Sequence, residues 1–141
     1  MVMPKRDGLV SGFMLGVAIA FAFAVVIRFI PAEWFVHPLS RTVLYAAQVP
    51  SALVFIPIGV AVARARGESP RQVLLWACVG ALAFDGLVLG FWPALYGQEG
   101  VALAVVATLL LWAFAWIVAA VLLLAPGGAE SAGRDNMQAA P

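Results

Sequence analysis

Residues 76–92 read WACVGALAFDGLVLGFW, an apolar run interrupted by one acidic residue, Asp85. A run of about 20 apolar residues is long enough to cross a bilayer as a helix. A charge at such depth costs about 2.5–3.5 kcal/mol on insertion scales. We therefore expect groups from neighbouring segments to offset the charge of Asp85, which makes this residue the first candidate for function.

The rest of the composition agrees with a membrane protein. Of the 141 residues, 65% are hydrophobic and 11% are charged, whereas soluble domains average about 25% charged residues. The mean hydropathy of +1.04 excludes a soluble domain. Membrane-length apolar stretches occur at Leu9–Ile30, Thr42–Ala63, Gln72–Trp92 and Gly100–Leu124. The sequence thus predicts an all-α, four-helix transmembrane bundle as a single domain over residues 1–124, followed by a disordered polar tail over residues 125–141.

The basic residues set the expected topology, because cytoplasmic loops of membrane proteins carry an excess of lysine and arginine. Two basic residues flank the first loop, Arg28 and Arg41. The other six lie before the first span, around the second loop and in the tail: Lys5, Arg6, Arg64, Arg66, Arg71 and Arg134. This distribution predicts that both termini are cytoplasmic.

Cysteine and histidine are too scarce for most cofactor chemistry. Cys78 is the only cysteine and His37 the only histidine of the chain. A redox pair, an intrachain disulfide, a cysteine metal cluster and a bis-histidine haem within one chain are therefore excluded. We expect no cofactor and no metal site. The expected partner is the lipid bilayer, with no role for nucleic acid.

Small residues recur every four positions along the first span: Gly8, Gly12, Gly16, Ala20 and Ala24. On a helix this spacing makes one shallow groove that lets another backbone approach closely in lipid. The groove can serve packing within the chain or between chains. The sequence therefore does not decide between a single chain, a homo-oligomer and a larger membrane complex. Gly86 and Gly90 make a second, shorter pattern of this kind beside Asp85, for packing or for function.

Two further features concern the shape of the spans. Pro31 ends the first helix, and Trp34 and Phe35 in the loop after it are expected at the level of the lipid headgroups. Pro50 and Pro57 each remove one backbone hydrogen bond from the second span and can bend it.

Three spans place a polar side chain at a similar depth. With a helical rise of about 1.5 Å per residue, Asp85 lies roughly 10 Å below the outer boundary, Gln48 about 9 Å and Thr108 about 12 Å. These depths predict an intramembrane polar cluster around Asp85. Ser51, near Gln48, and Trp112, one turn after Thr108, are its further candidate members.

Arg28 is the expected cation of this cluster. The Cα–Cβ bonds of a helix tilt toward its N-terminus, so a cytoplasmic N-terminus directs the Arg28 side chain deeper into the bilayer. We therefore hypothesise an Arg28–Asp85 ion pair, with Arg41 as the rival cation.

Three functions can be weighed for such a cluster. A structural pair that fixes how the helices pack is the leading interpretation, and a proton- or cation-linked transport site that uses Asp85 is the alternative. An enzyme is disfavoured, since the spans offer no second carboxylate and no nucleophile with a base. The chain is thus expected to be a non-enzymatic structural or accessory membrane subunit.

The order of these features resembles a family of small bacterial four-span membrane proteins, a domain of unknown function. The resemblance covers most of residues 10–123. It rests on Arg28-Phe29 at the end of the first span, on Phe84-Asp85 through Trp92-Pro93 with Tyr96, and on Leu111-Trp112-Ala-Phe-Ala. The resemblance implies a multi-pass protein of the bacterial inner membrane and assigns no activity.

Overall fold

The structure, a computed structural model, describes residues 8–124, and these form helices and connecting turns without a strand. In chain order the elements are α1 (Leu9–Arg28), α2 (Ala32–Val36), α3 (Pro38–Leu53), α4 (Phe55–Arg66), α5 (Pro70–Phe91), the 3₁₀ turn η1 (Pro93–Tyr96) and α6 (Gly100–Leu124). Four helices are long and apolar enough to span a membrane, with α3 and α4 together forming the span Pro38–Arg66. The prediction of an all-α chain with four membrane-length helices is therefore confirmed for the described residues. The predicted tail, residues 125–141, lies outside them.

The second span is interrupted between α3 and α4, at Val54. Pro57 has no N–H, so it cannot donate to the carbonyl of Leu53 four residues earlier, and the helix is broken at that point. Pro50 lies inside α3, which continues through it. The two prolines thus differ in effect, although each removes one hydrogen bond.

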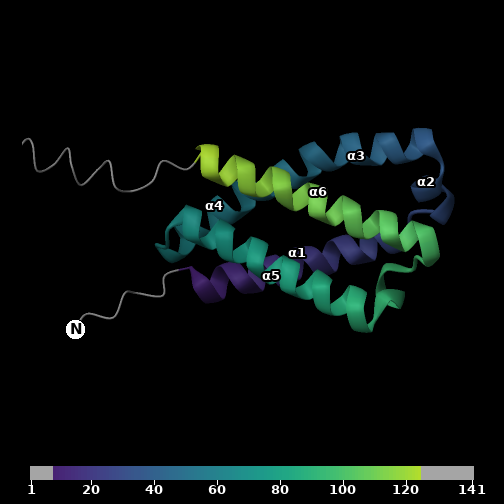
Figure 1. Ribbon diagram of the computed structural model, residues 1–141. Coiled ribbons are helices and arrows are strands. Elements are labelled where there is room, and N and C mark those ends of the chain that lie inside the picture. The colour runs from purple at the N-terminus through teal and green to yellow at the C-terminus, as the bar shows by residue number, and fades with distance from the viewer. Residues whose placement is uncertain (1–7, 125–141) are drawn as a thin grey trace, which may run out of the picture.

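The long helices pack side by side, with α1 against α5, α3 against α6 and α4 against α5 (Figure 1). The short elements α2 and η1 lie together at one end of the molecule, which we call the α2 end. The α4–α5 turn, Gly8 at the start of α1 and the last turn of α6 lie at the opposite end, the Gly8 end. At the Gly8 end, the hydroxyl of Ser11 donates a hydrogen bond to Glu68 and so ties α1 to the α4–α5 turn.

The small-residue groove of α1 is filled by α5. All five of its residues, Gly8 through Ala24 at four-residue spacing, are buried. A Cβ added at Gly16 would overlap the carbonyl oxygen of Ala77, and one at Gly80 on α5 would overlap the carbonyl oxygen of Phe13. The backbones of α1 and α5 therefore approach so closely that glycine is required on both sides, and the groove is used within the chain.

Within residues 8–124, the second glycine pattern, beside Asp85, does not pack against another helix. Gly86 and Gly90 are exposed, and a Cβ at either position would meet nothing within 4 Å. In the described part of the chain, these two glycines therefore contribute no close helix packing.

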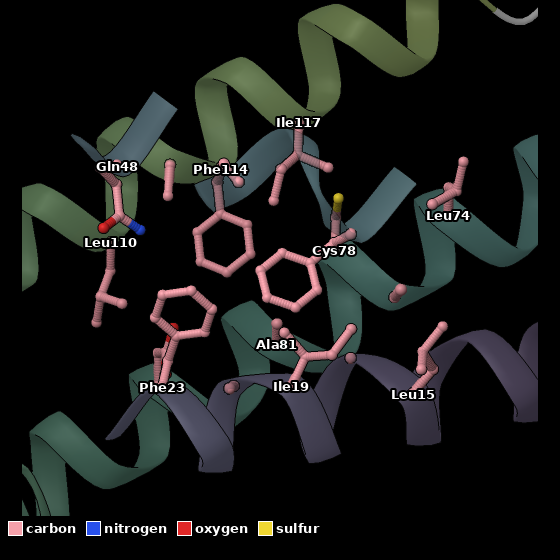
Figure 2. Close-up of a pocket in the computed structure, with 17 residues that line it drawn as sticks. Leu15, Ile19, Phe23, Gln48, Leu74, Cys78, Ala81, Leu110, Phe114 and Ile117 are labelled. Atoms are coloured by element: carbon pink, nitrogen blue, oxygen red, sulfur yellow. The ribbon is translucent and has the colours of Figure 1, made fainter. Parts of the chain in front are cut away.

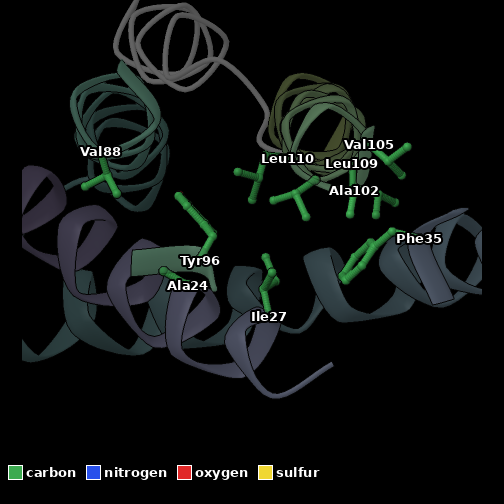
Figure 3. Close-up of a cluster of buried hydrophobic side chains, with 10 residues drawn as sticks. Ala24, Ile27, Phe35, Val88, Tyr96, Ala102, Val105, Leu109 and Leu110 are labelled. Carbon is green, nitrogen blue, oxygen red and sulfur yellow. The ribbon is translucent and has the colours of Figure 1, made fainter. Parts of the chain in front are cut away.

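The main hydrophobic core lies at the α2 end, where α1, α2, α5, η1 and α6 meet (Figure 3). Phe35 is 1% exposed and points into this core, whereas Trp34 is 45% exposed. Phe35 thus packs inside the protein and not against lipid, because the loop forms the helix α2, which turns one face toward α6. The expected level of the two rings at the headgroups stays a prediction.

Candidate functional site

Asp85 is buried on the inner face of α5 and is held by a tyrosine. Its side chain is 5% exposed, and its Oδ1 accepts a hydrogen bond of 2.5 Å from the hydroxyl of Tyr96. Oδ2 is buried as well and has no hydrogen-bond partner among the described residues. One carboxylate oxygen is therefore satisfied by Tyr96, whereas the other is buried without a partner among the described residues.

Tyr96 reaches Asp85 from η1, the turn that follows α5. Its side chain is completely buried in the core of the α2 end (Figure 3). Burial, and then the hydrogen bond and charge of Asp85, raise the pKa of Tyr96 above its ordinary value. The phenol consequently keeps its proton at neutral pH and acts as the donor of the pair.

Arg28 lies elsewhere. It is the last residue of α1, it is exposed, and its guanidinium donates a long hydrogen bond of 3.4 Å to the carbonyl of Ala94. No ion pair joins Arg28 to Asp85 within residues 8–124; the hypothesised pair is replaced by the Tyr96 hydrogen bond. The physical reason is desolvation, since an exposed guanidinium keeps its hydration while a buried one would add a second desolvated charge.

Gly97 explains how the chain passes so close to Arg28. It has a φ of 64°, in the left-handed region that favours glycine, and a Cβ there would lie 2.8 Å from Cγ of Arg28. The turn after η1 therefore needs glycine for both its conformation and its space.

Gln98 ties the same turn to the end of α1. Its side chain is 3% exposed, and its amide nitrogen donates to the carbonyls of Ile30 at 2.8 Å and Ile27 at 3.3 Å. Helix ends leave their last carbonyls without an intrahelical partner. Gln98 satisfies these carbonyls and so holds the chain segment that carries Tyr96.

Replacing Gln98 with methionine should lower the free energy of unfolding by about 1 kcal/mol, the net value of one typical hydrogen bond. The loss is modest because the Ile27 carbonyl also accepts from the backbone N–H of Ile30, so mainly the Ile30 carbonyl is affected. Thermal unfolding in detergent measures it. A variant as stable as the wild type would mean that the amide does not brace α1.

A second polar group lies between α3 and α6. The hydroxyls of Tyr45 and Thr108 are 2.6 Å apart, and the indole N–H of Trp112 donates to the carbonyl of Tyr45 at 3.3 Å. Trp112 and Trp116 pack edge to face, with ring centroids 5.5 Å apart. Thr108 and Trp112 are exposed and bond to Tyr45 of α3, so they belong to this group and not to the surroundings of Asp85.

The remaining candidates, Ser51 and Arg41, are also separated from Asp85. Ser51 donates to the carbonyl of Ala47 in its own helix at 2.8 Å, and Arg41 is exposed in the first turn of α3. Only Gln48, among the predicted neighbours of Asp85, lines the same cavity as the carboxylate.

This cavity lies between the spans and has a volume of about 60 Å³. All four spans contribute to its wall, which is apolar except for Gln48, Cys78 and Asp85. Figure 2 shows Phe114, Ile117 and Ile19 around its middle, with Gln48, Leu110 and Phe23 at one end and Leu74 at the other. The geometry therefore combines an apolar cavity with one acidic lining residue, Asp85, whose second carboxylate oxygen is buried without a partner among the described residues.

Comparisons of the chain with protein-family models, with curated proteins and with solved structures return no match. The resemblance to a bacterial four-span family stays a prediction, and the function rests on the geometry alone.

Three residues of the site were not singled out as partners by the sequence: Tyr45, Tyr96 and Gln98. Tyr96 and Gln98 lie in the segment that follows α5, and nothing in their spacing shows that this segment turns back into the core. Tyr45 precedes Gln48 by about one helical turn, but the helical rise places it only about 4.5 Å below the outer boundary, against about 12 Å for Thr108, so depth did not predict their contact.

Proposed function

We propose that this chain is a multi-pass protein of the bacterial inner membrane with a non-enzymatic, structural or accessory role, folded as a four-helix bundle with cytoplasmic termini. The charge distribution supports the orientation. Arg64, Arg66 and Arg71 lie in or beside the α4–α5 turn, at the Gly8 end, whereas Arg28 ends α1 at the α2 end. The positive-inside rule then assigns the Gly8 end to the cytoplasm. The bilayer is the first partner, and other membrane chains are the partners of an accessory role.

The observation that carries the structural role is the Tyr96–Asp85 hydrogen bond. With Gln98 and Arg28, it fastens the turn after α5 to α5 itself and to the end of α1. The bonds of Tyr96 and Gln98 join buried groups that a bilayer would otherwise leave without a partner. The polar residues of the α2 end therefore serve the packing of the spans.

A small proton- or cation-linked transporter is the second candidate, and one specific observation favours it. The Oδ2 atom of Asp85 has no hydrogen-bond partner within residues 8–124, and the residue lines a cavity between the spans. A purely structural role requires only the hydrogen bond that Oδ1 accepts from Tyr96. Ionisable residues inside membranes frequently mark the paths of protons and ions.

Asp85→Asn separates the two functions. The asparagine oxygen can still accept from Tyr96, so the variant should fold with a midpoint of thermal unfolding close to that of the wild type. For the structural role, we expect proteoliposomes with wild-type protein and with Asp85→Asn to dissipate an imposed pH gradient at the same rate as protein-free liposomes. Gly86→Ala, beside Asp85 but facing open space, is the matched control.

A gradient-driven flux that the wild type and Gly86→Ala support and that Asp85→Asn abolishes would overturn the structural role in favour of transport. The loss of flux must occur in Asp85→Asn protein that elutes as a single folded species.

A further inference from the structure

The α4–α5 turn lies at the Gly8 end of the molecule (Figure 1) and carries an excess of positive charge. Arg64 and Arg66 are exposed in the last turn of α4, and Arg71 lies in the first turn of α5. Glu68 is the one acidic residue between them. Within residues 8–124, no salt bridge joins any of the three arginines to a carboxylate. The described residues therefore leave this positive charge without a counter-charge.

The α2 end lacks this excess. Its two arginines, Arg28 and Arg41, are accompanied by Glu33 in α2 and by Glu99 just before α6. All four side chains are exposed. Among the described residues, an anion thus meets equal numbers of both charges at the α2 end and mainly arginines at the α4–α5 turn.

The backbone of the α4–α5 turn is held by its own hydrogen bonds. Gly67 has a φ of 65°, its N–H donates to the carbonyl of Arg64, and the N–H of Glu68 donates to the carbonyl of Ala63. These two bonds form the Schellman motif, which ends many helices. The Glu68 side chain accepts a hydrogen bond from Ser11 of α1. The turn is therefore fixed before any ligand binds, and its acidic residue is already engaged.

Arg71 adds a charge that its own helix does not favour. It lies at the N-terminus of α5, where the positive end of the helix dipole disfavours a cation. Its side chain is partly buried, and its Nε has no hydrogen-bond partner among the described residues. Arg64 and Arg66, by contrast, lie at the C-terminus of α4, where the dipole favours cations. An anion beside the turn would lower the energy of Arg71 through its charge, without contact with Nε.

The turn lies at the level of the lipid headgroups. α4 ends the second span at Arg66, and α5 begins the third span at Pro70. Both helices are long and apolar enough to cross the hydrocarbon core, so the turn between them lies just outside it. The planar guanidinium of arginine binds phosphate oxygens through paired hydrogen bonds. A lipid phosphate is therefore the anion that this turn meets first.

We propose that the α4–α5 turn is a binding site for the headgroups of anionic phospholipids. The exposed guanidinium groups of Arg64 and Arg66 donate to phosphate oxygens, and the charge of Arg71 adds to the attraction. The topology proposed above places this site in the cytoplasmic leaflet. The site lies outside the interior of the spans, so it is compatible with the structural role and with the transport role.

Native mass spectrometry of the full-length protein in non-ionic detergent measures this binding. Palmitoyl-oleoyl-phosphatidylglycerol, which is anionic, is compared with the phosphatidylcholine of the same acyl chains, which has no net charge. One arginine near an anionic surface changes the affinity about fivefold. The wild type should therefore bind phosphatidylglycerol at least about fivefold more tightly than phosphatidylcholine. Equal affinities for the two lipids overturn the site.

Arg66→Gln and Arg41→Gln form a matched pair, because each removes the charge of one exposed arginine, at opposite ends of the molecule. Arg66→Gln should lower the preference for phosphatidylglycerol about threefold to fivefold. A helix of about 20 residues separates charges at its two ends by about 30 Å, or three Debye lengths at 0.1 M salt. Arg41→Gln should therefore change the preference less than about twofold. Equal losses in both variants would indicate general attraction to a basic protein and overturn the site.

Replacing Arg64, Arg66 and Arg71 together with glutamine should bring the ratio of the two affinities to about one. Thermal unfolding without added lipid reports whether this variant is folded. Should it unfold, Arg64→Gln/Arg66→Gln changes only exposed side chains and should still lower the preference at least about fivefold. A folded variant that keeps the preference of the wild type overturns the site.

Glycerol 1-phosphate distinguishes a lipid from a soluble phosphate, since it has the headgroup phosphate without acyl chains. At the same concentration as the lipid, it should leave phosphatidylglycerol bound to the wild type. Displacement of the lipid would assign the turn to soluble phosphates and overturn the lipid site. These measurements do not depend on flux, so their failure is distinguishable from failure of the structural or the transport role.

Discussion

Gly16→Ala is expected to lower the free energy of unfolding by about 1–3 kcal/mol, the range found when atoms are forced into a closely packed interior. The added methyl group would overlap the carbonyl oxygen of Ala77 and lie 2.7 Å from its carbonyl carbon. Both atoms belong to the backbone of α5, so no side-chain rotation can make room. The helices α1 and α5 would have to move apart, and the dispersion contacts along the whole groove would weaken.

Gly86→Ala is the matched control for this substitution. It adds the same methyl group to α5, where nothing lies within 4 Å of the new atom. Alanine is favoured over glycine in a helix by about 1 kcal/mol, so this variant should be unchanged or slightly more stable. Thermal unfolding of both variants in the same detergent measures the difference. Equal midpoints would contradict the close α1–α5 contact.

The fold could be predicted from the sequence in its main features, for a reason specific to membranes. In a bilayer each backbone polar group needs a partner within the protein, so a long apolar run is committed to a helix. The four-residue spacing of small residues in α1 likewise predicted a close helix contact. The structure has this contact between α1 and α5, where only glycine fits at position 16. The helix α2 and the break at Val54 were not predicted in detail, since both depend on short-range loop geometry.

The candidate site was harder to predict, because helical rise gives the depth of a residue but not its direction around the helix axis. Asp85 and Thr108 were placed at similar depth, yet Asp85 is buried against Tyr96 while Thr108 is exposed and bonded to Tyr45. The hydrogen-bond partner of Asp85 is Tyr96, which lies in the turn that folds back after α5. Gly97 at positive φ and Gln98 on the carbonyls of α1 shape that turn, and their consequence for Tyr96 appears only in three dimensions.

The hydrogen bond between Tyr96 and Asp85 gives the other large expected effect. Tyr96→Phe keeps the buried ring and removes one oxygen, so the carboxylate of Asp85 loses its hydrogen bond while it stays buried. Leaving a buried polar group without its partner costs about 1–3 kcal/mol, and more for a charged group. We therefore expect Tyr96→Phe to lower the free energy of unfolding by at least about 2 kcal/mol, measured by thermal unfolding in detergent.

The same substitution should have the opposite sign once Asp85 is replaced by leucine. In Asp85→Leu the Tyr96 hydroxyl is the buried group without a partner, so its removal by Tyr96→Phe relieves a penalty instead of creating one. The double variant is thus expected to be at least as stable as Asp85→Leu alone, and the coupling free energy of the cycle should be at least about 2 kcal/mol, in the upper part of the range found for residues in contact. Additive effects of the two substitutions would show that the side chains do not interact, and the structural role proposed for the α2 end would then lose its central contact. A sign reversal, by contrast, is the result expected when the phenol and the carboxylate satisfy each other in the folded protein.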